Sequence, residues 1–349
     1  MKREEVQIDF VIAWVDGNDP EWQKRKKDVL GGAYSDDRAE RYFDWDLLRY
    51  WFRGVETFAP WVHTVFFLCD QDPPAWLNTE HPRLRIVRHE DFIPAAYLPT
   101  FNSHTIELNI FRIPNLSEHF VYFCDDMYLI RPIKPEAFFK NGLPVDCAGL
   151  NPLPSSDLAP GSRDKKIFYI PLNDTEYLNR EYCFRECIRK HPLKWYNVRY
   201  GDYLIRNLFL SSYSRFVGFS VFHLAQPYRR AAFEDAWQKN RDILDATCRH
   251  PIRDDHDVSQ SFIRYRQLAE GKFVPGRPIK KAVFHITEEV AKPCNMIRYQ
   301  TKPMICLNDG EMDPAQRKHA RDKLKQAFEA ILPRRSSFEI PATKESSAQ

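Results

Sequence analysis

The sequence lacks the segments that would place it in a membrane or in an oxidising compartment. Its longest apolar runs, such as residues 10–15, are far too short to cross a bilayer, and no apolar segment follows the charged first residues. We therefore expect a cytoplasmic protein. None of the eight cysteines forms a CxxC pair, so we expect reduced, mostly buried thiols, and the spacing gives a zinc site no support.

A strong charge of one sign and the common phosphate-binding motifs are missing as well. The net charge of +3 is too close to neutral for a dedicated nucleic-acid binder, so no nucleic-acid partner is expected. Neither GxGxxG nor GxxxxGK[ST] occurs, which argues against a dinucleotide-binding Rossmann fingerprint and a P-loop. The chain contains no internal repeat. A small anionic substrate remains compatible with this composition.

The sequence does contain a regular alternation of strand-like and helix-like segments up to residue 130. Helical spacing of apolar residues occurs at 44–58 and 105–113. Continuous apolar runs that predict buried strands lie at 8–15, 64–69, 84–87 and 120–123. This alternation predicts an α/β fold, with a mostly parallel sheet and flanking helices. The apolar share of 43% is enough for a large core.

The length of 349 residues allows one large α/β domain with insertions or two smaller domains. A stretch rich in Pro, Ser, Gly and Asp at 151–162 indicates a loop, and 175–209 is helical in pattern. The predicted division is an α/β part at 1–150, a helical insertion or cap at 151–215, a second part at 216–334 that completes the same domain, and a disordered tail at 335–349.

Acidic residues follow three of the predicted strands. These residues are Asp16 and Asp19, Asp70 and Asp72, and Asp125 and Asp126. Ligands of parallel sheets bind at the carboxyl ends of the strands, so we expect these acids to share one cleft. The adjacent pair Asp125 and Asp126 suits Mg²⁺ or Mn²⁺ held against a phosphate. The alternative is that this pair merely begins a loop.

Two basic regions in the second half are candidates for anion binding. His223 stands before a Pro-bearing turn and close to Arg229 and Arg230, although a lone histidine is more often structural. Arg253 precedes an expected helix start at 255–257, where it could contact a phosphate. The simpler interpretation of that segment is a helix cap with charged neighbours.

Residues 313–335 predict a basic amphipathic helix. Its apolar face, with Leu324, Phe328 and Ile331, could lie on the inner face of an anionic membrane or pack on the protein's own core. We expect packing on the core, as in most amphipathic helices of globular proteins.

Several segments resemble the four conserved regions of the Stealth family, over about residues 8–309. The matching segments are IDFVIAWVDGNDPEW, LLRYWFRGVETFAPWVHTVFFLCDQDPPAWL, LPTFNSHTIELNIFRIPNLSEHFVYFCDDM, FHLAQPYRRAAFEDAW with IRDDHDVSQSF, and CLND. This family includes bacterial capsular polysaccharide phosphotransferases and the catalytic subunit of the animal lysosomal-enzyme GlcNAc-1-phosphotransferase.

The resemblance implies a sugar-1-phosphate transferase. Such an enzyme moves hexose-1-phosphate, here expected to be N-acetylhexosamine-1-phosphate, from a UDP-sugar to a glycan hydroxyl and releases UMP, in capsular or cell-surface polysaccharide synthesis. The implied catalytic residues are Glu107, Asp125, Asp126, His223 and Arg253, with Asp125 and Asp126 as ligands of Mg²⁺ or Mn²⁺. The expected substrate-binding residues are Trp14, Asp16, Gly17, Arg49, Asn102, Ser103, Arg229 and Asn308. The part at 1–150 would bind the nucleotide sugar.

The sequence departs from the family at one position beside the acidic pair. Relatives often have Asn there, whereas this chain has Cys124. Two other functions stay open at this stage. A metal-dependent glycosyltransferase would use the same donor but release UDP, and a sugar-binding protein without activity would turn over no donor.

Overall fold

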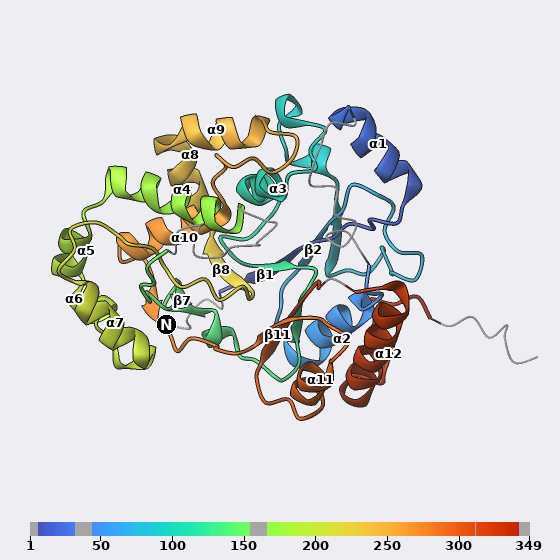
Figure 1. Ribbon diagram of the computed structural model, residues 1–349. Helices are drawn as coiled ribbons and strands as arrows, with labels where there is room; N and C mark the ends of the chain where they lie inside the picture. Colours follow the sequence, from blue (N-terminus) through green and yellow to red (C-terminus); the bar gives the residue numbers. More distant parts are fainter. Residues whose placement is uncertain (1–5, 32–43, 154–165, 311, 342–349) are drawn as a thin grey trace, which may run out of the picture.

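The computed structural model describes residues 6–31, 44–153, 166–310 and 312–341, and a five-stranded sheet forms its centre (Figure 1). The strands, in spatial order, are β3 (Leu84–Val87), β2 (Val65–Leu68), β1 (Ile8–Ala13), β4 (His119–Cys124) and β8 (Gln226–Arg229). The first four are parallel, and β8 is antiparallel to β4. The predicted α/β fold with a mostly parallel sheet is therefore confirmed, because the four predicted strands form its parallel part.

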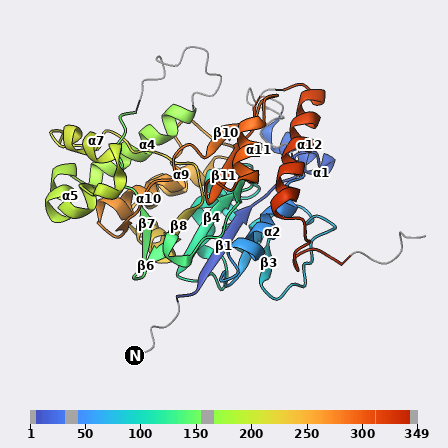
Figure 2. The same ribbon diagram turned by 90° about the horizontal axis from the view of Figure 1, so that it is seen from below.

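Helices cover both faces of this sheet, since its strands are apolar on both sides. In β1, Phe10 and Ile12 face one core, whereas Val11 faces the other. The first core is closed by α2 (Leu48–Phe58), α11 (Ala291–Arg298) and α12 (Pro314–Ile331). The second is closed by α3 (Ser103–Asn109), α8 (Arg230–Lys239), α9 (Arg241–Arg249) and α10 (Gln260–Ala269). In Figure 1, α3, α8 and α9 lie above the sheet and α2, α11 and α12 lie below it, and Figure 2 gives the view from below.

Two small sheets that the sequence did not predict extend this frame. One contains β10 (Val283–His285), β11 (Met304–Asn308) and β5 (Met127–Leu129), and the other contains β6 (Phe139–Lys140), β7 (Leu143–Asp146) and β9 (Val274–Pro275). Only the turn at Asp125 and Asp126 separates β5 from β4. Because β11 pairs antiparallel with β5, Cys306 lies opposite Met127 and the end of β11 reaches this acidic turn.

The segment after residue 165 is helical, as the sequence predicted. It comprises α4 (Lys166–Glu181), α5 (Phe184–Lys190), α6 (Pro192–Trp195) and α7 (Asp202–Leu210), drawn in green at one side of Figure 1. Helix α4 packs against α10, which joins this segment to the main body. Residues 154–162 of the expected loop lie outside the described residues. The role of 151–215 as a cap stays a prediction, as does the division into parts.

The predicted start of the helix after Arg253 is wrong. Helix α10 begins at Gln260 and is capped by the Ser259 side chain. Asp257 is fully buried, and its carboxylate accepts a hydrogen bond from Asn102 Nδ2 (2.8 Å) and lies 2.7 Å from His250 Nδ1. This acid therefore fastens the loop to α3 instead of starting a helix, and Arg253 belongs to the fastened loop.

The C-terminal helix packs on the protein's own core, as expected. Leu324 and Phe328 of α12 are fully buried, and the Phe328 ring stacks on Tyr50 of α2 with 5.2 Å between ring centroids. The disordered tail predicted from residue 335 is wrong for residues 335–341, because Phe338 is fully buried and Glu339 is 4% exposed. Residues 342–349 lie outside the described part. No described helix combines the length and apolarity needed to cross a bilayer.

The packing of α12 predicts that Phe328→Ala lowers the free energy of unfolding by about 3–5 kcal/mol, because the change leaves a cavity between α12 and α2. Urea unfolding measures this loss. Lys318→Ala, on the exposed side of the same helix, is the matched control and should change the free energy by less than about 0.5 kcal/mol. A fully stable Phe328→Ala variant that loses binding to anionic vesicles would favour the membrane interpretation of this helix.

Candidate active site

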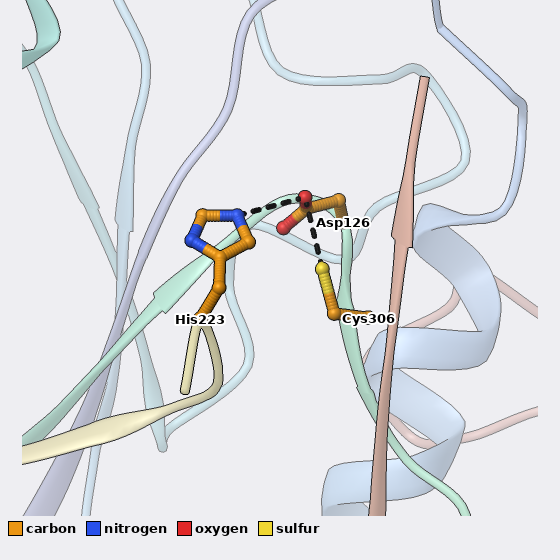
Figure 3. Close-up of side chains that lie close together, drawn as sticks. All are labelled: Asp126, His223 and Cys306. Atoms are coloured by element: carbon orange, nitrogen blue, oxygen red, sulfur yellow. Dashed lines mark hydrogen bonds and ion pairs between the residues drawn. The ribbon is translucent and has the colours of Figure 1, made fainter. Parts of the chain in front are cut away.

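The acidic turn between β4 and β5 lies at the centre of the candidate site. Asp126 Oδ2 is 3.3 Å from His223 Nε2 and 3.2 Å from Cys306 Sγ (Figure 3). Asp126 Oδ1 is buried and has no hydrogen-bond partner among the described residues. A buried carboxylate oxygen without a partner is costly, so this atom is suited to a ligand.

Asp125 lies in a crowd of negative charge. This residue is exposed to solvent, at the tip of the turn between β4 and β5. Partial desolvation, followed by the charges of Asp126, Asp309 and Asp44, raises the pKa of Asp125 to about 8. Desolvation is also the largest cause of the raised pKa of Asp44, and the charge of Asp16 adds to it. The carboxylates of Asp125, Asp126, Asp309 and Asp44 repel one another. Together they form a donor set of hard oxygens, which fits Mg²⁺ or Mn²⁺.

His223 comes from the loop that precedes β8. Its backbone has a positive φ of 27°, which is unusual for a residue other than glycine. Burial lowers the pKa of His223, but the hydrogen bond and charge of Asp126 outweigh it, so the pKa lies above its ordinary value. The expected Pro-bearing turn after His223 is wrong. Pro227 lies within β8, the last strand of the sheet, where its missing N–H is tolerated.

Helix α3 and the loop before α10 supply a second group of predicted residues. Arg253 donates to Ser103 Oγ from Nε (3.0 Å) and Nη2 (2.6 Å). Glu107 is buried and accepts a hydrogen bond from Tyr122 Oη at 3.3 Å. The charges of Glu107 and Arg253 both act on His223, so the structure brings these residues close to the acidic turn.

A cavity of about 700 Å³ opens beside this turn, at the carboxyl ends of β1 and β2. Asp16, Asp19, Asp70 and Asp72 line it, together with Trp14, Trp76, Arg25, Arg88 and Asp44. Two of the three acidic groups predicted to share a cleft therefore line this cavity, whereas Asp125 and Asp126 are not among its lining residues. Asp44 lines the cavity and its charge acts on Asp125, so the cavity and the acidic turn are neighbours.

Partly buried hydrogen bonds hold the walls of this cavity in place. Gln71 donates from Nε2 to Asp19 Oδ2 (2.7 Å) and to the Asp16 carbonyl (2.9 Å), which ties the loop after β2 to the loop after β1. The Gly17 carbonyl accepts from Gln23 Nε2 at 2.6 Å. Arg49 lies over the Trp76 ring at 4.7 Å, at the edge of the cavity.

Not every predicted substrate-binding residue joins the site. Arg229 pairs with Glu118 at 3.0 Å and stands opposite His119, at the start of β4, so it lies at the wrong end of that strand. Asn102 is fully buried, because its side chain caps α3 and bonds Asp257. Asn308 does lie near the turn, with Oδ1 3.1 Å from Cys306 Sγ.

Sequence reasoning missed three residues that lie near the acidic turn, namely Asp44, Asp309 and Cys306. The segment 305–310 carried a signal, because it is an apolar run that ends in polar residues, like the strands whose acids were selected. Asp44 precedes α2, outside any strand end, and gave no such signal. Cys124 ends β4, and burial raises the pKa of its thiol well above the ordinary range.

These features define an α/β enzyme with an acidic centre at the carboxyl ends of its strands. Three models of the Stealth protein family match the chain: conserved region 1 over residues 6–34, conserved region 2 over 41–145 and conserved region 4 over 295–349. The last match includes α12 and the ordered segment after it.

Characterised relatives cover nearly the whole chain. The capsular polysaccharide phosphotransferase WcwK of Streptococcus pneumoniae is 36% identical over 340 residues, which cover 95% of this chain and 98% of the relative. The exopolysaccharide phosphotransferase cps2G of Lactiplantibacillus plantarum is 35% identical, over 95% of this chain and 96% of the relative. The receptor polysaccharide phosphotransferase WefC of Streptococcus oralis is 35% identical, over 95% and 99%. The chain therefore belongs to the Stealth family and is a phosphotransferase.

Proposed function

We propose that this enzyme transfers hexose-1-phosphate from a UDP-sugar to a hydroxyl group of a capsular or exopolysaccharide acceptor and releases UMP. The observation that carries the proposal is the contact of Asp126 with His223 beside an acidic cluster, next to a cavity large enough for a nucleotide sugar. The relatives named as capsular, exopolysaccharide and receptor polysaccharide phosphotransferases support this acceptor class. We place the reaction in the cytoplasm, at the inner face of the plasma membrane, where nucleotide sugars meet growing chains.

His223 is the proposed general base. Its Nε2 faces Asp126, so the imidazole is oriented and Nδ1 is left to take the proton of the acceptor hydroxyl. Asp126 also stabilises the imidazolium that forms, because its charge favours protonated His223. The acceptor oxygen then attacks the phosphorus next to the sugar. The bond between this phosphorus and the bridging oxygen of the diphosphate breaks, and UMP leaves with the electron pair of that bond.

Charge on the transferred phosphate must be neutralised for this step. Arg253 supplies a planar guanidinium, already oriented by Ser103, that suits the phosphate oxygens. Asp125 and Asp126, with Asp44 and Asp309 beside them, would hold Mg²⁺ or Mn²⁺. When bound, the metal supplies positive charge to the diphosphate. N-acetylhexosamine remains the proposed sugar.

Product analysis tests the proposed reaction. The purified enzyme is incubated with a panel of UDP-sugars and a glycan acceptor in the presence of Mg²⁺ or Mn²⁺, and nucleotides are separated by chromatography. Release of UMP, with phosphorus in the glycan product, is the expected result. Release of UDP without phosphate transfer would show a glycosyltransferase instead, and donor binding without turnover would show a sugar-binding protein.

We expect His223→Ala and Arg253→Ala to be nearly inactive but to bind the UDP-sugar with unchanged affinity. Both residues act on the acceptor and the transferred phosphate, whereas the uridine lies in the cavity lined by Trp14 and Trp76. Calorimetry with the UDP-sugar and a UMP assay measure the two effects. His256→Ala is the control, because that side chain is 90% exposed and bonds only locally to Asp254. Loss of donor binding in both variants would assign these residues to the donor site.

A further inference from the structure

Three side chains with different donor atoms converge at the acidic turn, namely Asp126, His223 and Cys306 (Figure 3). One donor atom from each lies within 4.8 Å of the other two. Asp126 comes from the β4–β5 turn, His223 from the loop before β8, and Cys306 from β11. These segments are far apart in the sequence, so no ligand spacing could reveal the group.

Two distances in this group are close to those between neighbouring ligands of a tetrahedral zinc site. Around zinc, nitrogen and oxygen ligands at about 2.0 Å stand about 3.3 Å apart, and sulfur at about 2.3 Å stands about 3.5 Å from oxygen. The observed separations from Asp126 Oδ2 are 3.3 Å to His223 Nε2 and 3.2 Å to Cys306 Sγ. The third pair, His223 Nε2 and Cys306 Sγ, lies within 4.8 Å, against about 3.5 Å around zinc. His223 would therefore shift toward Cys306 to close the site.

The donor types point to zinc rather than magnesium. Magnesium takes hard oxygen ligands, which the cluster of Asp125, Asp44 and Asp309 supplies. A carboxylate, an imidazole and a thiolate together suit Zn²⁺, and three protein ligands leave its fourth position open.

We propose that Asp126, His223 and Cys306 form a zinc-binding site, and that Zn²⁺ bound there inhibits the transferase. Binding displaces the Cys306 proton, which leaves to solvent as the sulfur–zinc bond forms.

Strand pairing holds two of the three ligands before any metal arrives. Cys306 stands opposite Met127 in the pairing of β11 with β5, and Leu307 N donates to the Asp126 carbonyl at 2.9 Å. His223 lies on a loop and its side chain is 44% exposed, so it can adjust to complete the site. A site that is largely formed in advance loses little affinity to ordering.

Inhibition rests on the proposed function, because the same Asp126 and His223 would serve the catalytic metal and the general base. Zinc between them would occupy the imidazole and compete for the carboxylate. Zinc binding itself does not depend on that function. Mg²⁺ should relieve the inhibition only weakly, since it has little affinity for thiolate and imidazole.

Zinc binding is tested on the full chain without donor or acceptor. Calorimetry with Zn²⁺ should show one site in the wild type, and Cys306→Ser should weaken it by about tenfold or more. Co²⁺ should give a thiolate charge-transfer absorption in the wild type that Cys306→Ser lacks. Cys183→Ser, which removes a half-buried thiol on the loop before α5, is the matched control and should bind zinc like the wild type.

Two results would overturn the site. One is zinc binding of wild-type strength in Cys306→Ser, and the other is such binding in His223→Ala. Because the His223 side chain is 44% exposed, the expected loss of zinc binding in His223→Ala is not explained by misfolding. UMP release at saturating Mg²⁺, measured against Zn²⁺ and normalised to each variant's rate without zinc, tests the inhibition. Zinc binding without any UMP release would leave the site intact and refute the proposed function. If UMP is released but zinc neither binds the enzyme nor inhibits it, the zinc site is refuted and the proposed function stands.

Discussion

Asp126→Asn will lower the rate of UMP release by about 10²–10³, and Asp125→Asn will have an effect of similar size, with the fold intact. Asparagine keeps the shape of the side chain and one acceptor oxygen but removes its charge. Asp126 would lose its hold on the catalytic metal and its support of protonated His223, whereas Asp125 would lose only the metal contact. The two variants should therefore differ in their pH profiles although both are slow.

The measurement is a UMP assay across a range of Mg²⁺ concentrations, with circular dichroism to confirm folding. Asp322→Asn, an exposed carboxylate on α12, is the control and should keep the wild-type rate. Higher Mg²⁺ should restore part of the activity if the lost contact is to the metal. Near-wild-type rates in both variants, with unchanged metal dependence, would show that this pair only begins a loop.

Arg53→Ala will lower the free energy of unfolding by about 3–5 kcal/mol, the largest stability effect we expect for a charged residue here. The Arg53 side chain is 8% exposed, and its Nε donates to Glu339 Oε1 at 2.8 Å. Its Nη1 donates to the Leu332 carbonyl at 3.0 Å, which fastens the chain after α12 to α2. Removal of the guanidinium leaves the buried Glu339 carboxylate with the longer contact to Arg49 (3.6 Å) and the Ser336 N–H among its remaining partners.

Urea unfolding compares this variant with Arg180→Ala, which breaks an exposed ion pair to Glu176 of the same kind on α4. The control should lose at most about 1 kcal/mol, because solvent screens such pairs. Equal losses of unfolding free energy in both variants would mean that burial of the Arg53–Glu339 pair adds nothing to stability. Truncation after residue 335 should reproduce most of the Arg53→Ala effect, since it also removes Glu339.

The sequence could predict the parallel part of the sheet because each strand is a continuous apolar run buried on both faces. That signal is local, so the existence of β1, β2, β3 and β4 is visible without a partner strand, with ends within two residues of those in the structure. For the same reason the acids after these strands could be assigned to one edge of the sheet. The order of the strands and the antiparallel position of β8 depend on contacts between distant segments, and the sequence did not show them.

Errors in the site arose where a side chain's role depends on its partner. Arg229 is predicted to bind substrate because it is close to His223 in sequence. Strand β8 separates the two residues in the structure, and the Arg229 guanidinium pairs with Glu118 at the opposite end of β4. The cap of α10 was placed at 255–257 because aspartate favours helix starts, yet buried Asp257 bonds across the loop. A sequence pattern cannot distinguish an acid that caps a helix from one that fastens a loop.

The sequence by itself determined the α/β class, the acidic pair after β4 and the resemblance to the Stealth family, because apolar periodicity and short motifs are written in contiguous residues. Only the tertiary structure decided which distant groups join that pair. Pairing of β11 with β5 brings Cys306 to Asp126, and the loop before β8 brings His223. Desolvation, followed by the charges of Asp126, Asp309 and Asp44, raises the pKa of Asp125. Distances between such groups are set by packing of the whole chain, and no local pattern contains them.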